Sequence, residues 1–177
     1  MKIVAKTDQG KIRKDNQDSF AAGELPGGVV WAVVCDGMGG AAGGSVASQT
    51  AVKMISEKIA SGYQYGMSDK SIKNLLTSVV ESANSSIYEM SCSVESLNGM
   101  GTTVVVSVIR DKELYLVHAG DSRAYRVTKD SITQLTRDHS VVQDMVEHGE
   151  LTEEQAKAHP RKNIIHKSAR RKRGNRD

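Results

Sequence analysis

Apolar residues recur at three- and four-residue spacings along residues 72–90 and mark one face of a helix. They are Ile72, Leu75, Leu76, Val79, Val80, Ala83, Ile87 and Met90. This period is typical of an amphipathic helix whose apolar stripe is buried, and Ser68 or Asp69 stands where an N-cap is expected. The stripe therefore predicts a helix that belongs to the core.

The chain before this helix predicts a buried strand and another helix. Residues 29–35 form a continuous apolar run rich in β-branched side chains, which is typical of a strand buried on both faces. The run ends at Asp36-Gly37-Met38-Gly39-Gly40. Residues 41–61 then predict a helix with Gly62 as its C-cap, and the small residues at its start would let it lie close to the sheet.

Shorter elements complete the pattern. Residues 2–7 alternate weakly, as an edge strand would, and the polar residues 8–19 interrupt that alternation. The remaining predictions are strands at residues 102–109, 114–119 and 123–128, a hairpin connection at Asp111-Lys112, a helix at residues 138–148 stopped by Gly149, and a capping box at Thr152-Glu153-Glu154-Gln155 that opens a short helix.

The order of these elements favours an α+β fold with helices packed on antiparallel sheets. Strands and helices come in runs, so a doubly wound parallel sheet is less favoured. The 177 residues have room for one domain with its own core. No apolar run approaches the roughly 20 residues of a membrane-spanning helix, and early charges interrupt any signal peptide. With only Cys35 and Cys92 available for pairing, we expect a cytoplasmic protein with reduced thiols.

Basic residues gather at the end of the sequence. Residues 161–177 hold eight Lys or Arg and one Asp, whereas residues 1–160 hold 16 basic and 20 acidic side chains. A solvated terminus fits this composition better than a nucleic-acid-binding arm, because no aromatic residue lies among the charges. The body of the chain is therefore acidic, as a site for cations would be.

Asp36 and Gly37 directly follow the predicted buried strand, so a rigid element would hold the Asp36 carboxylate at the rim of a sheet. This placement suits Mg²⁺ or Mn²⁺, which prefer oxygen ligands, and a glycine lets its carbonyl oxygen approach the ion. A tight Asp-Gly turn without a ligand is the alternative, and it is the commoner case for a lone Asp-Gly. A phosphate-binding loop at residues 37–44 is weaker, because the Lys-Ser/Thr ending of a P-loop is missing.

Two further polar groups favour a site for phosphate together with metal. Arg13, Asn16 and Asp18 lie within six residues, and Gly120-Asp121-Ser122-Arg123 separates two predicted strands. Arginine binds phosphate bidentately, and an anion or a metal would organise a guanidinium that lies among carboxylates. Each group alone is more often a turn or a surface ion pair.

Four groups of residues are similar in order and spacing to motifs of the bacterial PPM-type (class 2C) serine/threonine protein phosphatases. They are Arg13-Lys14-Asp15-Asn16-Gln17-Asp18, Asp36-Gly37-Met38-Gly39-Gly40, Gly101-Thr102-Thr103 and Gly120-Asp121-Ser122-Arg123-Ala124-Tyr125. Residues 137–140 and 159–165 resemble the next segments of the family, so the resemblance spans residues 1 to about 165.

The resemblance implies an antiparallel β-sandwich flanked by helices, with two Mn²⁺ or Mg²⁺ ions at one end and a third in bacterial members. Asp36 corresponds to the carboxylate that bridges two metals, and Gly37 to the residue whose carbonyl oxygen binds one. Asp18 matches the acidic residue that holds the cluster, and Asp121 one that helps to hold the third metal. Arg13 matches the arginine that binds the substrate phosphate.

The implied activity is hydrolysis of phosphoserine and phosphothreonine in proteins by a metal-activated water, without a phosphoenzyme. The implied substrates are phosphoproteins made by a bacterial serine/threonine kinase. We further expect a monomer with no membrane partner and no nucleic-acid partner. Some family members have a histidine at the position of Met38, so the resemblance assigns no proton donor there.

Members of the family continue beyond the segment that residues 159–165 resemble, to two further metal-binding aspartates. Residues 166–177 contain neither of those motifs. We therefore expect a partial phosphatase domain at residues 1–165, with an incomplete sandwich, and a basic, disordered tail at residues 166–177 produced by a reading-frame change or an artificial boundary. The alternative function is a non-catalytic module that binds phosphoproteins or a partner through Arg13 and Asp36.

Overall fold

The structure is a computed structural model that describes residues 1–158. The predicted tail at residues 166–177 and the motif-like residues 159–165 lie outside the described residues. The chain divides into two compact units, Met1–His118 and Ala119–Asp177, and each unit is described here by itself.

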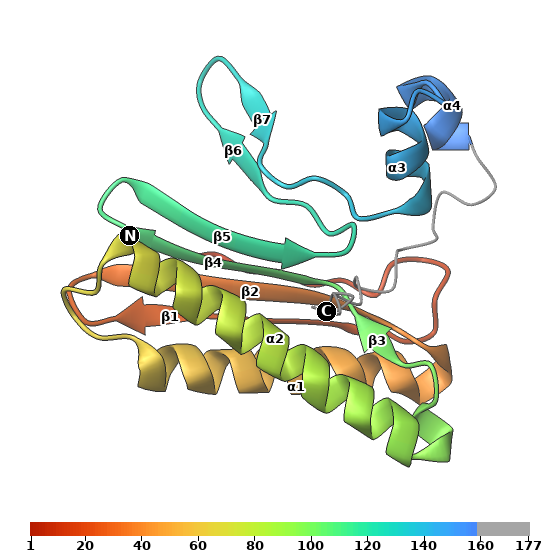
Figure 1. The fold of residues 1–177 in the computed structure, drawn as a ribbon, viewed down its shortest axis with the longest axis horizontal. Coiled ribbons are helices and arrows are strands. Elements are labelled where there is room, and N and C mark those ends of the chain that lie inside the picture. Colours follow the sequence, from red (N-terminus) through yellow and green to blue (C-terminus); the bar gives the residue numbers. More distant parts are fainter. Residues whose placement is uncertain (159–177) are drawn as a thin grey trace, which may run out of the picture. The chain divides into compact units, whose positions relative to one another are not determined.

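The first unit is built on an antiparallel sheet. Its strands are β1 (Asp18–Leu25), β2 (Val29–Met38), β3 (Gly101–Thr102), β4 (Val104–Arg110) and β5 (Glu113–Ala119). The strand order is β1-β2-β4-β5, and β3 also pairs with β2 (Figure 1). β2 is therefore the central strand, with β1 on one side and both β3 and β4 on the other.

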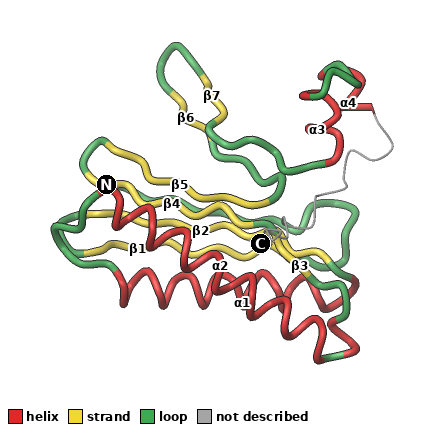
Figure 2. The backbone as a smooth tube through the Cα atoms, viewed as in Figure 1, coloured by secondary structure: helices red, strands yellow, loops and turns green. Residues whose placement is uncertain are grey.

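Two long helices cover one face of this sheet, as the backbone tube in Figure 2 shows. They are α1 (Gly40–Gly62) and α2 (Asp69–Ser93), and a short 3₁₀ helix, η1 (Glu95–Leu97), follows. The buried side chains of α2 all belong to the predicted apolar stripe, namely Ile72, Leu76, Val79, Ala83 and Ile87. Ser68 is the N-cap, because its hydroxyl accepts a hydrogen bond from the Ser71 amide at 3.2 Å.

The core lies between the two helices and the sheet. Its fully buried side chains include Ile55 and Ile59 of α1, and Val33, Val106 and Val108 of the sheet. Burial of each such aliphatic side chain contributes about 1.5–3 kcal/mol to folding. The predicted α+β fold with helices on an antiparallel sheet is confirmed.

One prediction at the start of the chain is wrong. Residues 2–7 form no strand, and the first strand is instead β1, for which the sequence predicted no element. β1 gives a weak sequence signal because Ala21, Ala22 and Gly23 fill its centre. Its pairing with β2 over its whole length, from Asp18 opposite Asp36 to Leu25 opposite Val29, stabilises it.

Gly62 does not end α1 in the way that the sequence suggested. It is the last helical residue, and the C-cap is Tyr63, which has an extended backbone. A Cβ atom on Gly62 would lie 2.7 Å from Cδ1 of Leu75, so the glycine permits close packing of α1 on α2. The requirement for glycine here is steric and comes from the neighbouring helix.

The second unit contains short elements. β6 (Tyr125–Val127) and β7 (Ile132–Gln134) form an antiparallel hairpin, and α3 (Val141–Glu147) and α4 (Glu153–Ala158) follow. The predicted capping box is confirmed, since the Thr152 hydroxyl accepts from the Gln155 amide at 3.2 Å and the Gln155 side chain accepts from the Thr152 amide at 2.8 Å. No helix among residues 1–158 combines the length and apolarity needed to cross a membrane.

Candidate metal and phosphate site

Asp18 and Asp36 lie directly opposite each other on the neighbouring strands β1 and β2. The next pair in the register, Ser19 and Cys35, faces α1, where the Ser19 hydroxyl lies 2.9 Å from that of Ser48. Side chains alternate along a strand, so the two carboxylates project from the opposite face of the sheet, and both residues are exposed. Like charges in this arrangement destabilise a sheet, and a bound cation removes that cost.

The backbone of Asp36 is held by Thr102 at the end of β3 and by Thr103, which lies between β3 and β4. Its N–H donates to the Thr103 hydroxyl oxygen at 3.0 Å. Its carbonyl oxygen accepts from the Thr103 amide at 2.9 Å and from the Thr102 hydroxyl at 3.0 Å. The two threonines of the Gly101-Thr102-Thr103 motif therefore hold the backbone of Asp36 in place by hydrogen bonds.

Gly37 is buried where β2 meets the first turns of α1. A Cβ atom on Gly37 would lie 2.1 Å from the carbonyl oxygen of Gly44, which no side chain can tolerate. The Gly37 amide also donates to the carbonyl oxygen of Gln17 at 3.2 Å. Glycine is required here by the close approach of β2 and α1, as the small residues at the start of the helix suggested.

Gln17 and Ser48 support this corner of the sheet, and sequence reasoning gave neither of them a role. The Gln17 side chain donates to the carbonyl oxygen of Gly40 at 3.0 Å. The fully buried Ser48 hydroxyl donates to the carbonyl oxygen of Gln17 at 2.7 Å. The only available signal was the position of Gln17 beside Asp18, because a buried serine in a helix has no pattern of its own.

Arg13 lies in the exposed segment that leads to β1. The Gln9 side chain donates to its carbonyl oxygen at 2.9 Å, and the Asn16 side chain accepts from the Asp18 amide at 3.0 Å. Among residues 1–158, the Arg13 guanidinium takes part in no ion pair. This cation is therefore available to an anionic ligand.

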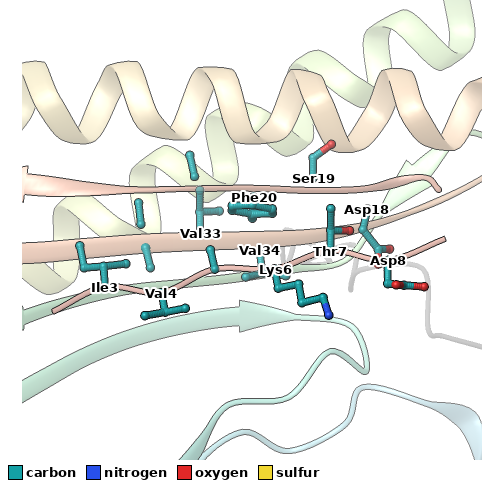
Figure 3. A pocket seen from close by; sticks show the side chains of 14 residues that line it. Ile3, Val4, Lys6, Thr7, Asp8, Asp18, Ser19, Phe20, Val33 and Val34 are labelled. Atoms are coloured by element: carbon teal, nitrogen blue, oxygen red, sulfur yellow. The ribbon is translucent and has the colours of Figure 1, made fainter. Parts of the chain in front are cut away.

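A cavity of about 410 Å³ lies between residues 3–8 and the sheet face that carries the two carboxylates. Figure 3 shows Asp8 and Asp18 at one end of it, and Ile3 and Val4 at the other. Phe20 and Val34 contribute apolar surface between these ends. The cavity thus joins a polar end, suited to cations, to an apolar floor.

The oxygen donors of the first unit fit Mg²⁺ or Mn²⁺. These ions are often held by one or two carboxylates, with water completing the coordination. Asp18 and Asp36 supply two carboxylates, and the described residues contain no group of three or more His, Cys, Asp or Glu side chains placed to hold a metal. Cys35 is a poor metal ligand, because metals bind the thiolate, and burial raises the pKa of this thiol to about 12.

Asp121 belongs to the second unit, where it is half-buried in the loop after β5. The loop is held at Gly120, whose carbonyl oxygen accepts from the His139 amide at 2.9 Å. It is also held at Arg123, whose Nε and Nη2 donate to the two carboxylate oxygens of Asp138 at 2.9 and 2.6 Å. These hydrogen bonds raise the pKa of Arg123 above its ordinary value, so this arginine stays charged and paired.

The family model of protein phosphatase 2C matches residues 11–174. The chain belongs to the protein phosphatase 2C family. It is 36% identical to the serine/threonine phosphatase stp of Listeria innocua over 160 residues. This match covers 90% of the chain and 63% of the relative. The chain is 33% identical to the phosphatase PstP of Mycobacterium tuberculosis, over 93% of the chain and 30% of the relative.

Solved structures of serine/threonine phosphatases share the fold. The serine/threonine phosphatase of S. agalactiae superposes with a TM-score of 0.84 at 36% identity, over 90% of this chain and 65% of that one. The catalytic domain of PstP in complex with two manganese ions gives 0.72 at 34% identity, over 85% and 61% of the two chains. The chain thus spans less than two thirds of the length of these relatives.

The comparisons confirm the family and the fold that the motifs suggested. Within the phosphatase 2C fold, the structure brings Asp18, Asp36 and Gly37 together at the ends of β1 and β2. Arg13 precedes β1, and Asp121 lies in the other unit. The individual roles of these five residues stay predictions.

Proposed function

We propose that this chain carries a metal-dependent site that hydrolyses phosphoserine and phosphothreonine in proteins. The observation that carries the proposal is the placement of Asp18 opposite Asp36 on the exposed face of the sheet. Membership of the phosphatase 2C family and the names of its relatives, serine/threonine phosphatases, support it.

Asp36, Asp18 and the carbonyl oxygen of Gly37 would hold two Mn²⁺ or Mg²⁺ ions, and Asp121 would help to hold a third. When bound, the cations would lower the pKa of a water molecule and neutralise charge on the phosphoryl oxygens. The PstP complex with two manganese ions supports this choice of metal and number.

Arg13 would bind the phosphate oxygens, because its guanidinium is exposed and takes part in no ion pair among residues 1–158. In the reaction, the oxygen of water bonds to phosphorus while the bond from phosphorus to the serine or threonine oxygen breaks. That oxygen leaves with a proton, and inorganic phosphate is the other product. The proposed reaction forms no covalent intermediate on a side chain.

The substrates would be phosphoproteins produced by a bacterial serine/threonine kinase, acted on by a monomer. An exposed phosphate site on a sheet face recognises mainly the phosphate group, so selection among proteins would depend on surfaces around it. The relatives named as serine/threonine phosphatases support the substrate class.

The test is hydrolysis of a phosphothreonine peptide and of an aryl phosphate with Mn²⁺. Asp36→Asn keeps the size of the side chain but removes the charge that binds cations, so we expect loss of about two orders of magnitude or more in activity. Asp111→Asn is the matched control, because Asp111 is exposed in a hairpin turn at a positive φ that asparagine also adopts.

A second arm uses a fusion to the remaining third of the Listeria relative, since the chain spans 63% of that protein. Activity in the fusion alone would show that the site needs further ligands from the rest of the domain. If both the chain and the fusion are inactive, or if Asp36→Asn is as active as its parent, the proposed function is wrong.

A further inference from the structure

The hydrogen-bonded ladder of β2 is interrupted opposite Asp36. β2 pairs with β4 as far as Val34 and Val105, and it pairs with β3 from Gly37 and Thr102 onward. Both pairings share one register, which places Asp36 opposite Thr103. Thr103 itself belongs to neither strand.

At this position a side-chain oxygen accepts the hydrogen bond that a backbone oxygen would normally accept. The Asp36 amide donates to the Thr103 hydroxyl oxygen at 3.0 Å, where a regular antiparallel pair would use the carbonyl oxygen of Thr103. The Thr103 amide still donates to the Asp36 carbonyl oxygen at 2.9 Å. Among the described residues, this pair therefore keeps one of its two usual backbone hydrogen bonds, and the threonine hydroxyl accepts the other.

This hydroxyl lies in the interior. Thr103 is 2% exposed, so solvent cannot readily take over its hydrogen bond if the oxygen is removed. We propose that Thr103 is a positioning residue for the metal-binding carboxylate of Asp36. Its hydroxyl fixes the backbone from which that carboxylate projects beside Asp18 on the same face of the sheet. The inference rests on the proposed function, because it assigns Asp36 to a metal.

Two substitutions distinguish the contribution of the Thr103 hydroxyl from that of the shape of its side chain. Thr103→Val keeps the shape and removes the oxygen, and Thr103→Ser keeps the oxygen and removes a methyl group. We expect Thr103→Val to weaken Mn²⁺ binding by about tenfold, as loss of supporting hydrogen bonds does at metal sites. Thr103→Ser should bind Mn²⁺ as the wild type does. The measurement is titration of Mn²⁺ followed by the electron paramagnetic resonance of the free ion.

Val106→Ala is the control for a general loss of stability. Val106 is fully buried in β4 opposite Val33, so its truncation weakens the same sheet without touching Asp36. Its Mn²⁺ affinity should equal that of the wild type. The positioning role is wrong if Thr103→Val binds Mn²⁺ as tightly as the wild type, or if Thr103→Ser and Val106→Ala lose as much affinity as Thr103→Val.

If Thr103→Val does not fold, hydrogen exchange provides a second test of the hydrogen bond between the Asp36 amide and the Thr103 hydroxyl. The Asp36 amide should exchange slowly in the wild type and in Thr103→Ser, and exchange at the rate of an exposed amide would overturn the inference. A wild-type chain that binds no Mn²⁺ would instead overturn the proposed function. Wild-type binding with unchanged binding in Thr103→Val would overturn the positioning role alone.

Discussion

Buried hydroxyl groups of the first unit form hydrogen bonds to backbone groups. Ser48 and Thr103 each satisfy a backbone group beside the candidate site. Two buried tyrosines provide a contrast. The Tyr115 hydroxyl lies 2.8 Å from the Asp69 carboxylate and accepts from Arg110 at 2.9 Å, whereas the Tyr63 hydroxyl has no hydrogen-bond partner among the described residues.

Tyr63→Phe should therefore leave the free energy of unfolding unchanged or raise it by about 1 kcal/mol, because it removes a buried polar group that makes no hydrogen bond. Tyr115→Phe should lower it, since Asp69 and Arg110 each lose a partner. Urea unfolding of the two variants measures both effects. A larger loss in Tyr63→Phe than in Tyr115→Phe would contradict this account of the two side chains.

At the scale of elements, a polar cluster joins the start of α2 to the hairpin of β4 and β5. Arg110 contacts the Asp69 carboxylate and the carbonyl oxygen of Met67, and its guanidinium lies 5.5 Å from the centre of the Tyr115 ring. The Tyr115 hydrogen bond, followed by Arg110, lowers the pKa of Asp69 below its ordinary value of 3.8. The charged form of Asp69 therefore stabilises the junction of helix and hairpin.

This cluster makes stability depend on pH in a defined direction. A carboxyl whose pKa is lowered by folding contributes stability above its ordinary pKa, and that contribution is lost as the pH falls through the folded value. The difference in unfolding free energy between the wild type and Asp69→Asn should be largest near neutral pH and should shrink as the pH falls below the ordinary pKa of 3.8. Urea unfolding across this range measures it, and a difference independent of pH would rule out the charge of Asp69 as its source.

The helices were predictable from sequence because their signals are local. The apolar stripe of α2 repeats over many turns, and the capping box of α4 lies within four residues. β1 was missed because its identity as a strand comes from pairing with β2, which the sequence of β1 alone does not encode. The single strand predicted at residues 102–109 is in fact β3 and β4, separated at Thr103 by a side-chain hydrogen bond.

In the whole molecule, the buried apolar side chains are unequally divided. Those described all lie between Leu25 and Tyr115, in the first unit, and the buried residues described in the second unit are Gly120 and the polar Thr136 and Ser140. Opening free energies follow buried apolar contact. The two units should therefore differ in local stability.

Native-state hydrogen exchange should show this difference. The amides of β2 and β4 should exchange slowest, and those of the β6 and β7 hairpin should exchange much faster, because the side chains of that hairpin are exposed. Similar protection in both sets of strands would show that the second unit gains its stability from contacts other than its own core.

The residues of the candidate site could be singled out from the sequence, but the pairing that brings them together could not. Asp36 was identified because a carboxylate directly follows a buried strand, and Asp18 and Arg13 because they match family motifs. That Asp18 lies opposite Asp36 depends on the register of β1 and β2, which their own residues leave open until the turn between the strands is formed. Thr103 was noticed only as part of a family motif, because a buried threonine bonded to a backbone amide has no sequence pattern that reveals the contact.

The close approach of Gly37 to Gly44 also bears on how sequences of this fold can diverge. A methyl group at Gly37 would meet a backbone atom 2.1 Å away, so the position excludes other amino acids whether or not the protein is active. Asp18 is exposed, and no comparable steric demand applies to it. If Asp18 binds a metal as proposed, a descendant that lost this function but kept its fold would therefore retain the glycine while the aspartate drifted. Among descendants of this chain, a retained Gly37 would indicate only that the fold is kept, whereas a retained Asp18 would indicate that the function is kept.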